Sequence, residues 1–350
     1  MDRSGAAARV LRLCGAGLDA LALRAQVLHE IGLAVGFDGY AWLLTDPLTW
    51  VGVAPLADVP WLPELPRHIQ LKYGTTLNRW TGLGSTHVAL LHGERGGDSP
   101  QGLLWRDFLG AHSIGDVASV VFPDQHGCWG FLELFRDAAR GPFTSAEAAF
   151  LADLVPPLTR ALRHSQAACF ATATDQDRAH AGPVVLLLSP DLQVLGQTPD
   201  THDYLRILVP PTGNRPPIPA SAYNVAGQLL AVEAGVDSHP ATARVHLSDG
   251  LWVTLRAARI GRLEPVNARD IAVTIEESSP AERLDLFARA FGLSARETEL
   301  LEHLASGSNT EELARQLFMS QHTVQDHLKS IFAKTATRTR PGLLARALGT

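Results

Sequence analysis

Apolar residues recur every three or four positions in three short segments near the end of the chain. They are Leu300, Leu301 and Leu304 in the first segment, Leu313 and Leu317 in the second, and Val324, Leu328, Ile331 and Phe332 in the third. This spacing places the apolar side chains of each segment on one face of a helix. The pattern therefore predicts three short helices between residues 293 and 335.

Polar residues mark where these helices begin. Two of them open with a capping box, in which a polar residue is followed by glutamate three positions later: Ser294 with Glu297, and Asn309 with Glu312. Ser320 can accept a hydrogen bond from the first amides of the third helix. A tight connection over residues 318–321 joins the second and third helices, and the third is rich in polar side chains. This layout is that of a helix-turn-helix.

Residues 1–165 predict a first α+β domain. Its expected elements are a helix over 5–35 interrupted at Gly15 and Gly17, two strands within 39–53 around a turn at Asp46-Pro47, helices over 62–73 and 100–111, strands over 116–123 and 128–136, and a helix over 144–165. Hairpins placed between helices in this order indicate an antiparallel sheet with helices packed on it.

Residues 166–182 lack periodicity and predict a linker, which a second α+β domain follows over residues 183–279. Its expected elements are two strands within 183–197, a helix from Pro199, a proline-rich loop over 209–220, a helix over 221–232, a hairpin over 242–260 with a tight turn at Asp249-Gly250, and a strand over 270–278. A helix over 280–292 then connects this domain to the C-terminal helices. The chain is therefore expected to be multidomain, with two α+β domains before an all-α domain.

The charge distribution limits where nucleic acid could bind. The whole chain has a net charge of −6. Residues 320–350 contain five basic residues and a single acidic one, Asp326, which is a net charge of +4. The other 319 residues therefore carry −10 and would repel DNA, so contact with DNA is expected at the C-terminal helices alone.

The C-terminal segment resembles the LuxR-type helix-turn-helix family of bacterial transcription factors. The resemblance rests on the runs LSARE, EELARQLFMS and TVQDHLKSIFAK followed by TRTR, and it covers about one-sixth of the chain. It implies a four-helix, all-α DNA-binding domain over residues 293–350, whose last helix spans 341–348. It also implies a cytoplasmic transcriptional regulator that binds double-stranded DNA as a homodimer and acts with RNA polymerase.

The same resemblance assigns base contacts to Gln325, Asp326 and Lys329. These side chains can pair with adenine, the amine of cytosine and guanine, respectively. Other DNA-binding positions implied on or after this helix, mainly at phosphates, are Gln321, His322, Thr323, His327, Lys334, Arg338 and Arg340. Two residues depart from the family pattern. Ala336 stands where glycine is usual after the third helix, and Asp326 replaces a neutral or apolar residue.

The first domain, 1–165, resembles GAF-type sensory domains in the order of its elements and in its closing segment FTSAEAAFLADLVPPLTRALR. The second, 183–279, resembles a compact PAS-type domain. Such domains imply control of the DNA reader by a small-molecule effector or a partner protein. The candidate lining of a ligand pocket is Tyr40, Trp42, Trp80, Trp105 and Trp129. The alternatives are that these aromatic side chains are plain core, and that the module serves ligand-free dimerisation or protein interaction.

No other chemistry is indicated by the residues. Three scattered cysteines fit a reducing cytoplasm and offer neither a disulfide framework nor a CxxC metal site. The nearest grouping, His112, His126 and Cys128, lacks an established ligand spacing. No GxxxxGK[ST] run occurs, and no apolar run approaches the roughly eighteen residues that cross a bilayer. We therefore expect no cofactor, no metal, no membrane span and no enzymatic activity.

Overall fold

A computed structural model describes residues 3–83, 85, 87–91, 108–170, 184–201, 219–247, 251–261 and 269–349. The chain divides into two compact units. The first unit comprises Met1–Leu162, Ala181–Val245 and Thr254–Glu276. The second comprises Arg163–His180, His246–Val253 and Glu277–Thr350.

The first unit contains an antiparallel five-stranded sheet with the strand order β2-β1-β5-β4-β3. Its strands are β1 (Gly39–Thr45), β2 (Gly52–Asp58), β3 (Val88–Leu90), β4 (Ile114–Asp124) and β5 (Gly127–Asp137). The helices around it are α1 (Arg3–Cys14), α2 (Ala20–Ala34), α3 (Leu65–Gly74) and α5 (Ser145–Ala168), with short 3₁₀ turns η1 (Leu62–Glu64) and η3 (Ala138–Arg140).

Helix α3 covers one face of this sheet. Lys72 of α3 forms a buried ion pair with Glu133 of β5. Phe131, two residues earlier on β5, stacks on Trp80 with the ring centroids 4.4 Å apart. Because side chains alternate along a strand, Phe131 and Glu133 lie on the same face. This face therefore combines aromatic packing with one buried charge pair.

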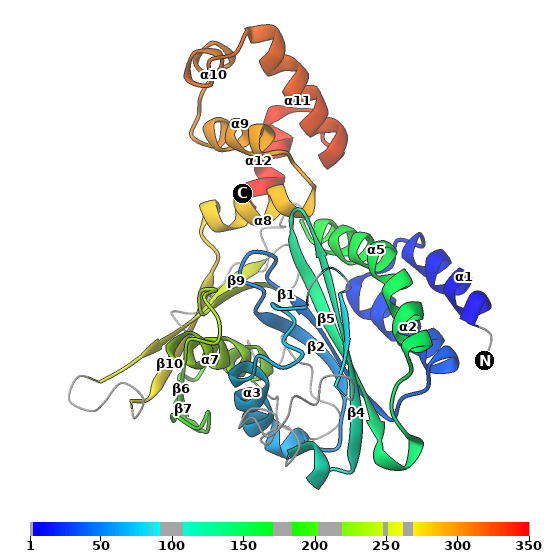
Figure 1. The fold of residues 1–350 in the computed structure, drawn as a ribbon. Coiled ribbons are helices and arrows are strands. Elements are labelled where there is room, and N and C mark those ends of the chain that lie inside the picture. Colours follow the sequence, from blue (N-terminus) through cyan, green and yellow to red (C-terminus); the bar gives the residue numbers. More distant parts are fainter. Residues whose placement is uncertain are drawn as a thin grey trace. The chain divides into compact units, whose positions relative to one another are not determined.

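Helices α1, α2 and α5 lie side by side over the opposite face (Figure 1). Leu162 of α5 approaches Gly130, which alternates with Phe131 along β5. Arg24 of α2 is buried and donates to the backbone oxygens of Trp42 and Ala54, each at 2.8 Å. Burial lowers the pKa of Arg24 to about 10. The guanidinium thus ties α2 to two neighbouring strands through their backbone carbonyl groups.

A second five-stranded sheet has the order β7-β6-β10-β9-β8. Its strands are β6 (Val184–Leu188), β7 (Val194–Gln197), β8 (Thr242–His246), β9 (Trp252–Arg259) and β10 (Ile271–Glu277). Helix α7 (Ala220–Glu233) packs against α3 and β2 of the first sheet. It is buried along most of its length, with ten buried residues from Ala220 to Ala231.

Buried polar contacts join the two sheets within the first unit. Asp46, at the β1–β2 turn, accepts from Nε of Arg244 on β8 at 2.7 Å, and both side chains are buried. A second buried pair joins Arg79 and Asp237 at 2.6 Å. The first unit thus holds the whole first sheet and most of the second.

The second unit is helical near its C-terminus. Its helices are α8 (Pro280–Ala290), α9 (Ala295–Ala305), α10 (Thr310–Gln316), α11 (Gln321–Thr335) and α12 (Arg340–Leu348). Capping boxes open α8, α9 and α10 at Ser279, Ser294 and Asn309. The apolar stripes predicted from the sequence are buried: Leu300, Leu301, Leu304, Leu313, Leu317, Val324, Leu328 and Ile331. Phe332 is half-buried.

Most predicted elements are confirmed, including the interruption between α1 and α2, the two hairpins of the first sheet and all four C-terminal helices. Some boundaries were wrong, and strand β3 was not predicted. Strand β2 continues to Asp58 beyond the expected end at 53, and α8 ends at Ala290 rather than at 292. The helix expected to end at Ser165 continues to Ala168, because the next residues favour helix and Gln166 and Ala167 are buried. Five expectations lie wholly or mainly outside the described residues: the helix over 100–111, the linker over 166–182, the helix from Pro199, the proline-rich loop and the Asp249-Gly250 turn.

The residue after α11 gives a first testable result. Ala336, which stands where glycine is usual in the family, adopts a left-handed conformation with φ of 51°. A β-carbon in this conformation costs about 1 kcal/mol. Ala336→Gly should therefore stabilise the second unit by about 0.5–1 kcal/mol. Ala333→Gly is the matched control: the same change inside α11 should destabilise by about 1 kcal/mol. Urea denaturation followed by hydrogen exchange of α11 amides measures both, and equal destabilisation by the two changes would contradict the assignment.

Candidate nucleic-acid interface

Helix α11 presents a polar, exposed face. Its N-cap Ser320 accepts a hydrogen bond from the amide of Thr323 at 3.1 Å. Val324, Leu328 and Ile331 are buried. The residues predicted to face outward are all exposed: Gln321, His322, Gln325, Asp326 and Lys329. Thr323, predicted as a phosphate contact, is exposed as well. The helix therefore offers side-chain donors and acceptors without uncovering its core.

Asp326 organises the middle of this face. Nζ of Lys329 donates to its carboxylate at 3.1 Å, and Nε2 of His322 lies 3.5 Å from the other carboxylate oxygen. The hydrogen bond from Lys329 and the charge of His322 lower the pKa of Asp326. Because these side chains are exposed, the pairs contribute little to stability and can exchange for contacts to a base or a phosphate.

Glu297 holds α11 from beneath. Its carboxylate accepts from Oγ of Ser330 and from Nζ of Lys334, both on α11, each at 2.6 Å. It also accepts from the amide of Ser294 at 2.6 Å as part of the cap of α9. Burial alone would raise the pKa of this carboxyl group, but the bonds from Lys334, Ser330 and Ser294 outweigh it and hold the pKa at about 2. One buried carboxylate thus fixes α11 on α9.

The remaining predicted DNA contacts have varied surroundings. Lys334 is exposed and pairs with the buried Glu297, and Arg340 donates to Oγ1 of Thr310 at 2.6 Å. Arg338 is exposed, and His327 is half-buried. The hydroxyl of Thr323 lies 2.9 Å from that of Ser320. Their contacts to DNA phosphates stay predictions.

The turn before α11 has an unusual backbone. Phe318 has φ of 53° and its side chain is 95% exposed. Arg296 of α9 donates to the carbonyl oxygen of Leu317 at 3.0 Å, so α9 also fixes the end of α10. The entry to α11 is therefore held by a polar contact rather than by burial of Phe318.

The aromatic residues predicted to line a ligand pocket are spread over the first sheet. Trp42 pairs with Leu132 and stacks on Phe122, with centroids 5.3 Å apart. Trp80 stacks on Phe131, which points to the other face because it adjoins Leu132 on β5. Indole Nε1 of Trp129 donates to Asp124, Tyr40 is half-buried beside Phe37, and Trp105 lies outside the described residues. The pocket itself stays a prediction.

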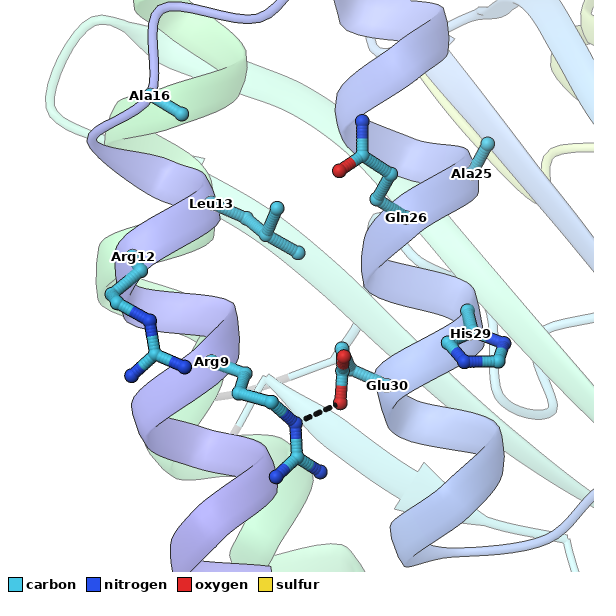
Figure 2. A pocket seen from close by; sticks show the side chains of 8 residues that line it. All are labelled: Arg9, Arg12, Leu13, Ala16, Ala25, Gln26, His29 and Glu30. Atoms are coloured by element: carbon cyan, nitrogen blue, oxygen red, sulfur yellow. Dashed lines mark hydrogen bonds and ion pairs between the residues drawn. The ribbon is translucent and has the colours of Figure 1, made fainter.

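A groove of about 530 Å³ lies between α1 and α2 (Figure 2). It is lined by Arg9, Arg12, Leu13, Ala16, Ala25, Gln26, His29 and Glu30. Arg9 and Glu30 face each other across it and pair at 2.5 Å. The described aromatic residues of the predicted pocket do not line this groove.

The part of the chain that the structure describes contains no candidate metal centre. No cluster of three or more His, Cys, Asp or Glu side chains within it could hold a metal ion. Cys128 is fully buried, and burial raises the pKa of its thiol to about 11. Among the described helices, none is long and apolar enough to span a membrane.

Sequence reasoning missed two residues that position the candidate interface. Glu297 was recognised as a helix cap, but its partners on α11 lie 33 and 37 residues later in the chain. Arg346 was counted only as part of the basic C-terminus, yet it donates to backbone oxygens inside the second unit. Neither contact follows a local spacing, so only the folded chain reveals them.

Residues 292–347 match the family described as bacterial regulatory proteins, luxR family. A probable csgAB operon transcriptional regulatory protein of Salmonella typhimurium is 44% identical over 48 residues, which are 14% of this chain and 22% of that protein. The transcriptional regulatory protein DesR of Bacillus subtilis is 35% identical over 63 residues, 18% of this chain and 32% of DesR. The chain thus spans less than one-third of the length of these curated relatives.

Among solved structures, Escherichia coli SdiA aligns with 93% of this chain and 90% of its own, at 15% identity and a TM-score of 0.32. Vibrio cholerae VqmA aligns with 48% of this chain and 83% of its own, at 16% identity and a TM-score of 0.19. The sequence matches, not these alignments, identify the C-terminal helices as a LuxR-type helix-turn-helix domain.

Proposed function

We propose that this chain, which carries a LuxR-type domain at residues 292–347, is a transcriptional regulator that binds double-stranded DNA through α11. One observation carries the proposal. The segment that matches the family presents Gln325, Asp326 and Lys329 on an exposed face, while Glu297 anchors the same helix from its buried side. A rigid helix with a polar outer face suits insertion into the major groove.

The three central side chains define a recognition hypothesis. Gln325 pairs with adenine, Lys329 reaches O6 and N7 of guanine, and Asp326 accepts from the amine of cytosine. The carboxylate of Asp326 would be repelled by a phosphate, so it belongs at a base edge. When DNA binds, the hydrogen bond between Lys329 and Asp326 breaks. Lys329 then bonds to guanine and Asp326 to cytosine, so each side chain exchanges one partner for another. Asp326 is therefore the residue that sets this reader's sequence preference apart.

We assign to the residues before the LuxR-type domain a role in controlling DNA binding, not in contacting DNA. We assign residues 1–165 as GAF-like and 183–279 as PAS-like, with a linker over 166–182 and a connecting helix over 280–292. Two antiparallel sheets flanked by helices agree with this assignment. The signal that these domains receive is a small-molecule effector or a partner protein, and they control DNA binding by a homodimer that acts with RNA polymerase.

Replacing Lys329 tests the DNA-reading assignment. Lys329→Ala should weaken binding to a specific duplex by about 1–3 kcal/mol, which is roughly 5- to 150-fold in Kd. The duplex is selected from a randomised pool by the wild-type chain, and isotherms are measured by fluorescence anisotropy. Binding to an unrelated duplex should change far less, because a base contact carries sequence information.

Arg338→Ala serves as the comparison for Lys329→Ala. As a predicted phosphate contact, Arg338 should contribute on the selected and the unrelated duplex alike, and its loss should reduce the salt slope by about one. An isotherm unchanged by Lys329→Ala on the selected duplex would refute its role in base reading. Failure of the wild-type chain to enrich any duplex would refute the proposed function.

Native mass spectrometry of the purified chain separates the two kinds of input. A co-purified small molecule would support sensing by the N-terminal unit. A dimer without any bound molecule would instead favour a module that serves dimerisation or protein interaction.

A further inference from the structure

Arg346 of α12 joins three separate segments of the second unit. Its Nε donates to the carbonyl oxygen of Phe170, which follows the end of α5, at 2.6 Å. Its Nη1 donates to the carbonyl oxygen of Thr335, the last residue of α11, at 2.5 Å. The guanidinium also lies 4.8 Å from the ring centroid of Phe291, just after α8. Desolvation by burial lowers the pKa of Arg346, consistent with a charge directed inward.

Phe170, the first of these hydrogen-bond acceptors, is held in place by its own packing. Its ring is fully buried and stacks on Trp252 at 4.8 Å, with Phe287 of α8 edge-on at 5.3 Å. The guanidinium of Arg283 lies over the same ring at 5.1 Å. The ring of Phe170 is therefore held among aromatic side chains, and its carbonyl group accepts the hydrogen bond from Arg346.

Thr335, the second acceptor, is the last residue of α11. The last carbonyl groups of a helix have no partner inside the helix, so they need one from elsewhere. For Thr335 that partner is Arg346, in the turn where α11 passes into the left-handed Ala336. The N–H groups of a planar guanidinium point in fixed directions. A shift of the carbonyl oxygen of Phe170 would therefore rotate the guanidinium and change its hydrogen bond to the carbonyl oxygen of Thr335.

We propose that Arg346 is a positioning residue that couples the end of α5 to the C-terminal turn of α11. Helix α5 begins at Ser145 in the first unit, and its last residues belong to the second. A displacement at the end of α5 is thereby passed to α11 through one side chain. Coupling between two sites is reciprocal, so DNA held by α11 must in turn order the end of α5. This inference rests on the proposed DNA-binding function.

Hydrogen–deuterium exchange of the full-length chain tests this coupling. Arg346→Met removes the donors but keeps an apolar stem beside Phe291. Arg289→Met is the matched control, because Arg289 pairs with Asp285 four residues earlier on α8. Without DNA, Arg346→Met should speed exchange at least about tenfold both in residues 166–170 and in residues 332–337, whereas the control should leave both segments unchanged.

The second arm adds the selected duplex. In the wild-type chain DNA should protect α11 and residues 166–170, and in Arg346→Met it should protect α11 alone. Protection of residues 166–170 in both proteins, or in neither, would overturn the coupling. Faster exchange at only one of the two segments in the DNA-free arm would also overturn it.

If no duplex protects α11 of the wild-type chain, DNA binding by α11 is refuted instead. The measurement without DNA would still show whether Arg346 links residues 166–170 to residues 332–337. If Arg346→Met does not fold, Arg346→Lys replaces it. A lysine ammonium keeps the charge but lacks the planar fork that reaches both carbonyl oxygens, so Arg346→Lys should also lose the protection of residues 166–170.

Discussion

Replacing Glu297 by alanine should lower the free energy of unfolding of the second unit by about 3 kcal/mol. The folded carboxyl group has a pKa of about 2 against 4.5 for the free side chain, and each pKa unit corresponds to about 1.4 kcal/mol. The change also leaves Lys334 and Ser330 of α11 without this partner. Urea denaturation, followed by hydrogen exchange of α11 amides, measures the loss. Glu299→Ala, an exposed glutamate on the same helix, should stay within about 0.5 kcal/mol of wild type.

The contribution of Glu297 should also depend on pH in a defined direction. The pKa of this carboxyl group is lower in the folded state than in the unfolded state, so the ionised form favours folding. Its stabilisation is complete above pH of about 4.5 and is lost as pH falls toward about 2. Glu297→Gln should therefore remove this part of the acid sensitivity of the second unit. Equal slopes for wild type and Glu297→Gln between pH 4.5 and 2 would contradict the assignment.

Asp46→Ala should destabilise the first unit by about 3–5 kcal/mol, because it leaves Arg244 with a buried guanidinium and no carboxylate partner at that position. Asp46 is buried and accepts from Nε and Nη2 of Arg244 at 2.7 and 2.9 Å. It also accepts from the amides of Arg244 and Leu48, at 2.8 and 2.9 Å. Burial alone would raise the pKa of Asp46, yet these partners lower it.

Tryptophan fluorescence during urea denaturation reports this change, since all tryptophans except Trp252 belong to the first unit. Asp38→Ala is the control, because Asp38 pairs with the half-exposed Arg140 at 2.7 Å. An exposed pair contributes about 1 kcal/mol or less. Similar losses for Asp46→Ala and Asp38→Ala would show that the two sheets are not held together by the buried pair.

Local patterns carried most of the fold prediction. The apolar spacing of Leu300, Leu304 and Leu313 and the capping boxes at Ser294 and Asn309 located the C-terminal helices, because both features act within one or two helical turns. Alternating residues located β4 and β5 for the same reason. The exposed face of α11 followed as well, since burying Val324 and Leu328 turns Gln325 and Asp326 outward.

Contacts between distant residues could not be predicted in this way. The link from Asp46 to Arg244 spans 198 residues, and that from Arg346 to Phe170 spans 176. No periodicity relates such positions, and each pair forms where packing brings two distant segments of the chain together. The linker predicted from residue 166 illustrates the limit, because Phe170 shows no local signal and is nevertheless buried among aromatic rings.

The amino-acid sequence by itself determined the C-terminal helices and placed Gln325, Asp326 and Lys329 on an outer face, because helix periodicity and capping depend on neighbouring residues. The LuxR-type character of this segment came from the resemblance of its motifs, and the family match over residues 292–347 supports it. Only the tertiary structure decided how that helix is held. Glu297 anchors α11 to α9, and Arg346 joins its last turn to Phe170, two residues after the end of α5. These contacts depend on desolvation and on the meeting of separate segments, which are properties of the folded chain.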